Sequence, residues 1–187
     1  MAVRFSRRLV LDVATASLVI MAGLALVHDR LLPALAERQR LDPGETVGEP
    51  FRFRQLASGD SLGLADGEPS LVVVFKSTCP VCEETAPAWA ALARLAPDRV
   101  FAIGLEADEP AAAWVREKLP TARAVRPLEP ASFIDLLRIR AVPTTLLFEG
   151  RRLSLARIGP LPPEDLARIR RALQGTRATE LAAVPHP

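Results

Sequence analysis

The middle of the chain alternates short apolar runs with amphipathic stretches, a pattern typical of strands that alternate with helices. FRFRQLASGDSL, from Phe51, alternates apolar and polar residues around a glycine-containing turn and predicts a β-hairpin. LVVVF at 71–75 and VFAIGL at 100–105 are continuous apolar runs, as in strands buried on both faces of a sheet. TTLLFEGRRLSLARIG, from Thr144, predicts a second hairpin that turns at Glu149-Gly150.

Four stretches carry helical periodicity. ETAPAWAALARLA has its apolar residues on one face, and Pro87 predicts a kink in its first half. DEPAAAWVREKL predicts a second helix with Asp108 as its N-cap. A short helical turn begins at Pro130, and a last helix begins at Pro162-Pro163 and ends with Gly175 as its C′ residue. The order hairpin, β, α, β, α, short helix, β, β, α predicts an α/β fold with a mixed sheet covered on both faces.

The first 28 residues have a different pattern. Arg4, Arg7 and Arg8 precede an apolar segment at 9–27, whose single charge is Asp12. As a helix this segment would span roughly 28 Å, about the hydrocarbon thickness of a bilayer. Because arginines favour the cytoplasmic side, we expect residues 1–28 to be a single-pass signal anchor in a bacterial inner membrane. The rest of the chain would then lie in the periplasm or otherwise outside the cytoplasm. A cleaved signal peptide is the alternative, although LALVHDR lacks a small-x-small cleavage site.

Composition divides the remaining chain into three parts. Residues 29–46 mix charges with proline and glycine and predict a juxtamembrane linker. Residues 47–175 hold the predicted strands and helices and form one domain, and residues 176–187 are expected to be a flexible tail. The net charge of +2, from 24 basic and 22 acidic residues, gives no excess positive field, so we expect no nucleic-acid partner.

The only cysteines, Cys79 and Cys82, form a CxxC pair just after the first buried strand. A closed zinc site needs about four ligands, and both histidines, His28 and His186, lie outside the predicted domain, so we expect no metal. Haem attachment needs a histidine after the second cysteine, where the chain has Glu83. A structural disulfide is the alternative, although closing so short a loop stabilises little. We expect a redox-active dithiol/disulfide couple that needs no other cofactor.

The predicted junction of strand and helix gives the two cysteines different roles. Cys79 would lie at the helix N-terminus, where free N–H groups and the helix dipole favour the attacking thiolate. Cys82, one turn further in, would be less exposed and would resolve the mixed disulfide. Pro80 fits the first helical turn, where its missing N–H costs nothing. Glu83 and Glu84 are either solvated acids of an ordinary helix start or a proton relay to Cys82.

These motifs resemble the thioredoxin superfamily. STCPVCEETAP has a proline five residues after the second cysteine, here Pro87, at the spacing of the helix-kinking proline of that family. AVPTTLLFEG resembles the segment in which the family has a cis-proline before a strand, here Pro143. The resemblance implies that Val142 pairs through its backbone with an incoming peptide, and that Pro80 and Val81 belong to the same substrate-binding surface. It also implies a thioredoxin-like mixed sheet flanked by helices.

The leading hairpin and the membrane segment resemble the membrane-tethered TlpA and ResA branch over about residues 45–175. STCPVC is also similar to the active site of the methylamine-utilisation accessory thioredoxin. The chain departs from the common pattern in two places, because Thr78 stands where thioredoxins usually have tryptophan and LVVVF lacks the buried acid of many members.

The resemblance implies an extracytoplasmic thiol-disulfide oxidoreductase that uses Cys79 and Cys82 to reduce or oxidise the cysteines of client proteins. A membrane protein would be its electron donor or acceptor. A second hypothesis belongs to another class: a non-catalytic thioredoxin-fold module that binds or assembles an envelope protein, for example in dehydrogenase or cytochrome maturation. That module would hold its client through Val142 and Pro143 without turnover.

Overall fold

The computed structural model describes residues 16, 17, 19–21, 23–25, 44, 46, 51–64 and 67–182, with 176–182 described by backbone alone. Residues 1–40 and 41–187 are two separate units. The described residues of the first unit are helical. Most of the predicted anchor at 1–28 and of the linker at 29–46 lies outside the described residues. Within the described ranges, the structure contains no helix with the length and apolar character needed to cross a membrane.

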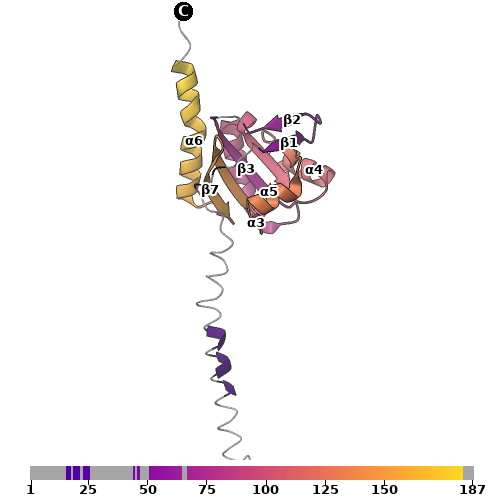
Figure 1. Ribbon diagram of the computed structural model, residues 1–187, viewed down its shortest axis with the longest axis vertical. Coiled ribbons are helices and arrows are strands. Elements are labelled where there is room, and N and C mark those ends of the chain that lie inside the picture. The colour runs from indigo at the N-terminus through magenta and orange to yellow at the C-terminus, as the bar shows by residue number, and fades with distance from the viewer. Residues whose placement is uncertain are drawn as a thin grey trace, which may run out of the picture. The chain divides into compact units, whose positions relative to one another are not determined.

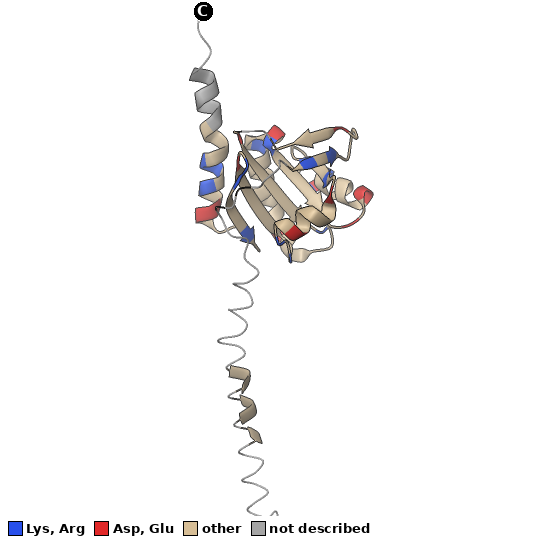
Figure 2. Cartoon of the chain, viewed as in Figure 1, with Lys and Arg blue, Asp and Glu red and all other residues tan. Residues whose placement is uncertain are grey.

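The second unit is built on one mixed sheet of seven strands (Figure 1). In sheet order these are β2 (Ser61–Gly63), β1 (Arg52–Gln55), β5 (Arg123–Pro127), β4 (Val100–Gly104), β3 (Pro69–Phe75), β6 (Thr144–Glu149) and β7 (Arg152–Ile158). The central strands β3, β4 and β5 are parallel, and antiparallel hairpins form both edges. Both predicted hairpins and both predicted buried strands are confirmed. The central strands β3 and β4 carry no charged residue (Figure 2).

Helices cover both faces of this sheet. They are α3 (Pro80–Leu95), α4 (Asp108–Lys118), α5 (Pro130–Leu136) and α6 (Pro163–Ala182), with a short 3₁₀ turn η2 (Pro97–Arg99). Successive side chains of a strand point to opposite faces. Leu71, Val73 and Phe75 of β3 therefore pack with α3, α4 and α6, whereas Val72 and Val74 pack with α5. The α/β fold class with helices on both faces is confirmed.

Phenylalanine rings fill the face that α5 covers. They are Phe51, Phe53, Phe101, Phe133 and Phe148. Phe53 of the first hairpin stacks on Phe101 of β4, with 5.6 Å between ring centroids, and meets the edge of Phe133 of α5 at 5.9 Å. Aromatic pairs at these separations stabilise a core beyond the area that they bury. The N-terminal hairpin is thus part of the core.

The strand β5 is absent from the sequence prediction. Its sequence RAVRP combines two arginines with a proline, and of its five residues Val125 and Pro127 are the buried ones. The strand forms because β4 pairs with it on one side and β1 on the other, which satisfies its backbone polar groups. Pairing with neighbours distant in sequence, rather than local propensity, determines this strand.

The helices α4 and α6 differ from the prediction at one end each. Ala107 is the N-cap of α4, so the prediction of Asp108 as N-cap is wrong, and Asp108 is the first helical residue. Its carboxylate accepts hydrogen bonds from Arg54 and Arg126 instead of from the helix N–H groups. The prediction of Gly175 as a C′ residue is also wrong, because α6 continues to Ala182. Gly175 does not have the positive φ of a C′ glycine, and TRATELA after it favours a helix.

Gly104, the last residue of β4, lies against α4. A Cβ atom added there would be 2.5 Å from the Cβ atom of Ala111, which forces a shift of strand or helix. We expect Gly104→Ala to lower the free energy of unfolding by about 1–3 kcal/mol. Gly63→Ala is the matched control, because the added Cβ would meet only the carbonyl oxygen of Phe51 at 3.9 Å. Urea unfolding followed by tryptophan fluorescence measures both, and equal losses of stability would contradict the packing argument.

Candidate active site

Cys79 is the N-cap residue of α3. The buried strand β3 ends at Phe75, and Pro80 begins the helix with the backbone angle that its ring requires. The Sγ atom of Cys79 accepts a hydrogen bond from the backbone N–H of Cys82 at 3.3 Å. The side chain is half-buried. The sulfur thus lies at an N–H donor and at the positive end of a helix, a position suited to the attacking cysteine of disulfide exchange.

Cys82 lies one turn further along α3 and is fully buried. Burial, together with the hydrogen bond to the Cys79 side chain, raises the pKa of Cys82 to about 12. The negative charges of Cys79 and Glu106 act in the same direction, and a hydrogen bond from the backbone of Lys76 acts against it. Cys82 is therefore a neutral thiol at neutral pH. The two sulfurs, which are both free thiols in this structure, are chemically unequal.

One of the predicted substrate-binding residues, Val142, contacts the side chain of Cys79. The Sγ atom of Cys79 donates a weak hydrogen bond to the carbonyl oxygen of Val142 at 3.9 Å. The peptide bond between Val142 and Pro143 is cis. Pro80 and Val81, which follow Cys79 in the chain, are exposed, with Val81 37% exposed. The structure thus brings together the CxxC segment and the segment before β6, which are 63 residues apart in sequence.

Glu83 and Glu84, the predicted proton-relay candidates, are both exposed. Glu83 accepts a hydrogen bond from the indole N–H of Trp114 at 2.7 Å and forms an ion pair with Lys118 at 3.0 Å. The hydrogen bonds from Trp114 and from Lys118 lower the pKa of Glu83. Trp114 in turn stacks on Phe75 with 4.2 Å between ring centroids. These contacts connect Glu83 with α4. A relay role for either glutamate stays a prediction.

Sequence reasoning missed Glu106, which follows β4. Its Oε1 atom accepts a hydrogen bond from the backbone N–H of Ser77 at 2.9 Å, in the loop that leads to Cys79. Its Oε2 atom is buried and has no hydrogen-bond partner within the described part of the chain. The missed signal is the position of an acid just after a strand parallel to β3. The carboxyl ends of such strands meet at one edge of the sheet.

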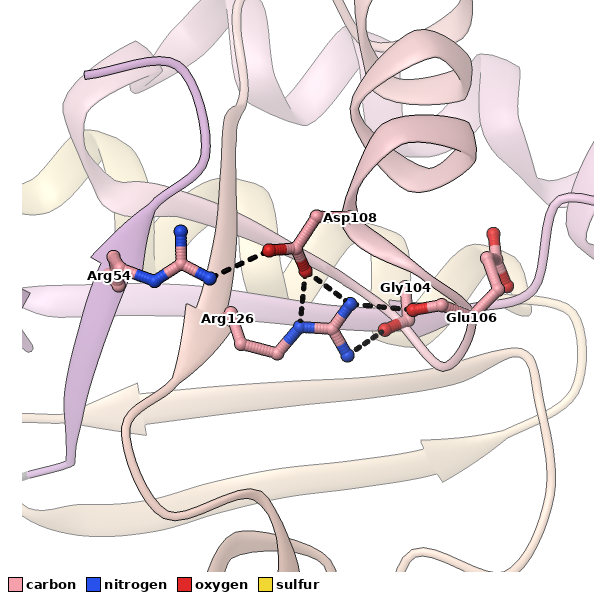
Figure 3. Close-up of polar contacts among 5 residues, drawn as sticks. All are labelled: Arg54, Gly104, Glu106, Asp108 and Arg126. Atoms are coloured by element: carbon pink, nitrogen blue, oxygen red, sulfur yellow. Dashed lines mark hydrogen bonds and ion pairs between the residues drawn. The ribbon is translucent and has the colours of Figure 1, made fainter. Parts of the chain in front are cut away.

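Arg126 of β5 holds the backbone that carries Glu106 (Figure 3). Its guanidinium donates to the carbonyl oxygens of Gly104 at 3.4 Å and Glu106 at 2.5 Å. It also donates to Asp108 at 2.7 Å, and Asp108 accepts a second hydrogen bond from Arg54 at 2.7 Å. The bonds from Arg54 and Arg126 lower the pKa of Asp108. Figure 3 shows the side chain of Glu106 pointing away from Arg126. Arg126 therefore fixes the backbone of the loop but does not pair with the Glu106 carboxylate.

Among the residues that the structure describes, no group of three or more histidine, cysteine, aspartate or glutamate side chains could hold a metal ion. A helix-capping sulfur next to a buried thiol can exchange disulfides with another molecule.

Alkylation should distinguish the two thiols. In the reduced full chain at pH 7 we expect iodoacetamide to modify Cys79 at least about 100-fold faster than Cys82, because Cys82 is buried and protonated. Mass spectrometry of the digested protein measures each site. The control is the same reaction in denaturant, where both cysteines should react at similar rates. Equal labelling of the native chain would contradict the asymmetry.

Alkaline pH should lower the free energy of unfolding of the reduced protein, because Cys82 ionises more readily in the unfolded chain. A pKa raised from 9.0 to about 12 contributes stability that is complete below pH 9 and is lost as pH rises towards 12. We expect the free energy of unfolding to fall by up to about 1.4 kcal/mol per pH unit in this range. Cys82→Ala should remove this part of the slope. Urea unfolding under reducing conditions at several alkaline pH values measures it, and identical slopes would show that Cys82 makes no contribution.

The structure is similar to several solved structures. StoA from Bacillus subtilis is 18% identical, with 67% of this chain and 98% of that chain covered and a TM-score of 0.53. A thio-disulfide isomerase from Thermus thermophilus is 19% identical, with 78% and 99% covered and a TM-score of 0.55. A secreted Mycobacterium tuberculosis disulfide oxidoreductase is 17% identical, with 67% and 95% covered and a TM-score of 0.51.

These similarities concern the fold. No protein-family model and no curated protein sequence matches the chain. Two of these structures are named as a thio-disulfide isomerase and a disulfide oxidoreductase, and each of the three is covered almost completely by the part of this chain that aligns with it. A CxxC pair at the N-terminus of α3, opposite a cis-proline, lies on a mixed sheet flanked by helices. The chain therefore has a thioredoxin-like fold, which it shares with these solved structures.

Proposed function

We propose that the chain is a protein thiol-disulfide oxidoreductase in which Cys79 and Cys82 form the redox couple. The observation that carries this proposal is the inequality of the two sulfurs. Cys79 is half-buried and its Sγ atom accepts a hydrogen bond at a helix N-terminus, whereas Cys82 is buried with a pKa of about 12. One attacking thiolate and one protonated resolving thiol are what disulfide exchange requires.

Exchange proceeds in two steps. The Cys79 thiolate attacks one sulfur of a client disulfide, forms a mixed disulfide and releases the other client sulfur as a thiolate. Cys82 then loses its proton and attacks the Sγ atom of Cys79, which forms the Cys79–Cys82 disulfide and releases the second client thiolate. The client gains two electrons and the CxxC pair loses two. Run in reverse, the same steps oxidise a client dithiol.

The client segment would bind at the edge formed by Val142. The carbonyl group of Val142 lies 3.9 Å from the sulfur of Cys79, so an extended peptide bound there through its backbone would have its cysteine close to that sulfur. Val81 would offer an exposed apolar contact there, and Leu105, the residue after β4, is also exposed. Pro143 is buried and cannot donate a backbone hydrogen bond, which leaves Val142 to provide the pairing.

The proposal extends to location and partners. The arginines at 4–8 and the apolar segment at 9–27 support a domain tethered to the outer side of a bacterial inner membrane. Disulfide exchange is common in such oxidising compartments. A membrane electron donor or acceptor would then restore the CxxC pair after each cycle. One similar solved structure is of a secreted protein.

Replacing the resolving thiol tests the proposal. We expect the full chain with Cys82→Ser to accumulate mixed disulfides between Cys79 and a peptide that contains a single disulfide, because the second step is blocked. Non-reducing gel electrophoresis and mass spectrometry detect the adduct, which a reductant should release. The matched control, Cys79→Ser with Cys82 intact, should give no adduct because Cys82 is buried.

The alternative class of protein predicts a different result. A non-catalytic binding module would form no mixed disulfide in the Cys82→Ser variant, and its client would stay bound when both cysteines are replaced. Absence of the adduct, together with absence of any disulfide reduction by the wild-type chain, would overturn the enzyme proposal.

A further inference from the structure

Resolution of the mixed disulfide poses a chemical problem in this site. A thiol with a pKa of about 12 is ionised in only roughly one molecule in 100,000 at pH 7, yet the thiolate is the species that attacks. A nearby side chain that accepts the proton would solve the problem. The strand β3, which leads to the cysteines, has no ionisable residue, so the acceptor must come from another element.

Glu106 comes from the neighbouring strand. Phe75 at the end of β3 is paired with Gly104 at the end of β4, and the N–H group of Leu105 donates to the carbonyl of Phe75 at 3.0 Å. This pairing brings the residue after Leu105 to the start of the CxxC loop. There the Oε1 atom of Glu106 accepts from the N–H group of Ser77 at 2.9 Å.

The second carboxylate oxygen of Glu106 is free to act. The Oε2 atom is buried, and no described residue gives it a hydrogen bond. Leaving a buried carboxylate oxygen unpaired is unfavourable, which calls for an explanation in function. The charge of Glu106 also acts directly on Cys82, where it disfavours the thiolate. The buried, unpartnered oxygen, the hydrogen bond to Ser77 in the loop before Cys79 and the charge effect on Cys82 all point to the same pair of groups.

Two other acids close to the starts of α3 and α4 are engaged elsewhere, and Glu84 is exposed to solvent. Glu83 is bound to Trp114 and Lys118, and Asp108 accepts from Arg54 and Arg126. Of the carboxylates in the described part of the chain, Glu106 is the one whose charge acts on Cys82; the other ionisable side chain that does so is Cys79.

The loop that carries Glu106 is fixed in position. Arg126 binds the carbonyl groups of Gly104 and Glu106, one on each side of Leu105, and Asp108 holds Arg126 in turn. Gly104 permits the close approach of α4, since a Cβ atom there would collide with Ala111 and lie 3.4 Å from the Oε1 atom of Glu106. A proton acceptor needs this kind of fixed geometry.

We propose that Glu106 accepts the proton of Cys82 during resolution of the mixed disulfide. This inference rests on the proposed function. The Cys82 S–H bond breaks and its proton goes to the carboxylate of Glu106, while the Cys82 sulfur bonds to the Cys79 sulfur. The bond between Cys79 and the client sulfur breaks, the client thiolate leaves with the electron pair, and Glu106 returns the proton to that thiolate or to water.

The test separates the two steps of exchange. The reduced full chain is mixed with 5,5′-dithiobis(2-nitrobenzoate) in a stopped-flow spectrometer. The first coloured thiolate is released when Cys79 attacks, and the second when Cys82 resolves the mixed disulfide. We expect Glu106→Gln to slow the second phase about 100-fold at pH 7 and to leave the first phase within a few-fold of wild type. The difference in second-phase rate between the variant and wild type should shrink as pH rises, because hydroxide replaces the missing base.

If Glu106 acts only through its charge, Glu106→Gln should change the rate of the second phase in the opposite direction. Removing the charge of Glu106 would then favour the Cys82 thiolate and accelerate the second phase. A second phase in Glu106→Gln that is as fast as in wild type, or faster, therefore overturns the proposal. A slowing of this phase that stays constant with pH also overturns it. Glu109→Gln is the matched control, since Glu109 is an exposed acid in the first turn of α4, and it should leave both phases unchanged.

A second variant covers the case in which Glu106→Gln does not fold, which circular dichroism would show. Glu106→Asp keeps a carboxylate on a shorter side chain and should retain a second phase with the shallow pH dependence of wild type. A steep pH dependence in Glu106→Asp would contradict the proposal. If wild type itself shows no second phase, the proposed function fails. If wild type shows it and the variants equal wild type, only the role of Glu106 fails.

Discussion

The site depends on one interaction, the parallel pairing of β3 with β4. It places the ends of two buried strands side by side, with Phe75 opposite Gly104. One strand continues into the loop and helix that carry the two cysteines, and the other continues into the loop that carries Glu106. Parallel strands of this kind gather functional groups at their carboxyl ends, because both chains must leave the sheet there. The chemistry of the cysteines is thus set by two segments that are distant in sequence.

The two cysteines differ in burial and hydrogen bonding because of ordinary helix geometry. A residue at the N-cap position has its side chain near unsatisfied N–H groups, and a residue three positions later has completed nearly one turn and faces the sheet. Cys79 is in the first position and Cys82 in the second. Neither property needs a special residue beyond Pro80, which suits the first turn. The acid that acts on Cys82 comes from outside this motif.

Sequence reasoning reached the parts of the fold that local pattern determines. The apolar runs of β3 and β4, both hairpins and the helix start at Pro80 follow from residues close in sequence. It missed β5, since RAVRP becomes a strand only through its two neighbours. It also missed Glu106 and assigned Asp108 to a cap, because both roles depend on Arg126 and Ser77, which meet them only in the folded chain. The resemblance to thioredoxins indicated Pro143, which no local pattern would have singled out.

The phenylalanine rings on the sheet face that α5 covers determine how much of the chain a folded unit requires. On the opposite face three helices cover the sheet, whereas here one helix of seven residues does so, and rings make up the missing cover. One of those rings, Phe53, belongs to the N-terminal hairpin and lies against Phe101 and Phe133. A chain trimmed to begin at β3 would keep both cysteines and Glu106 but would expose part of the apolar face of the sheet to water. The segment ahead of β3 is therefore not a spacer that could be shortened freely, because Phe51 and the first hairpin complete the core.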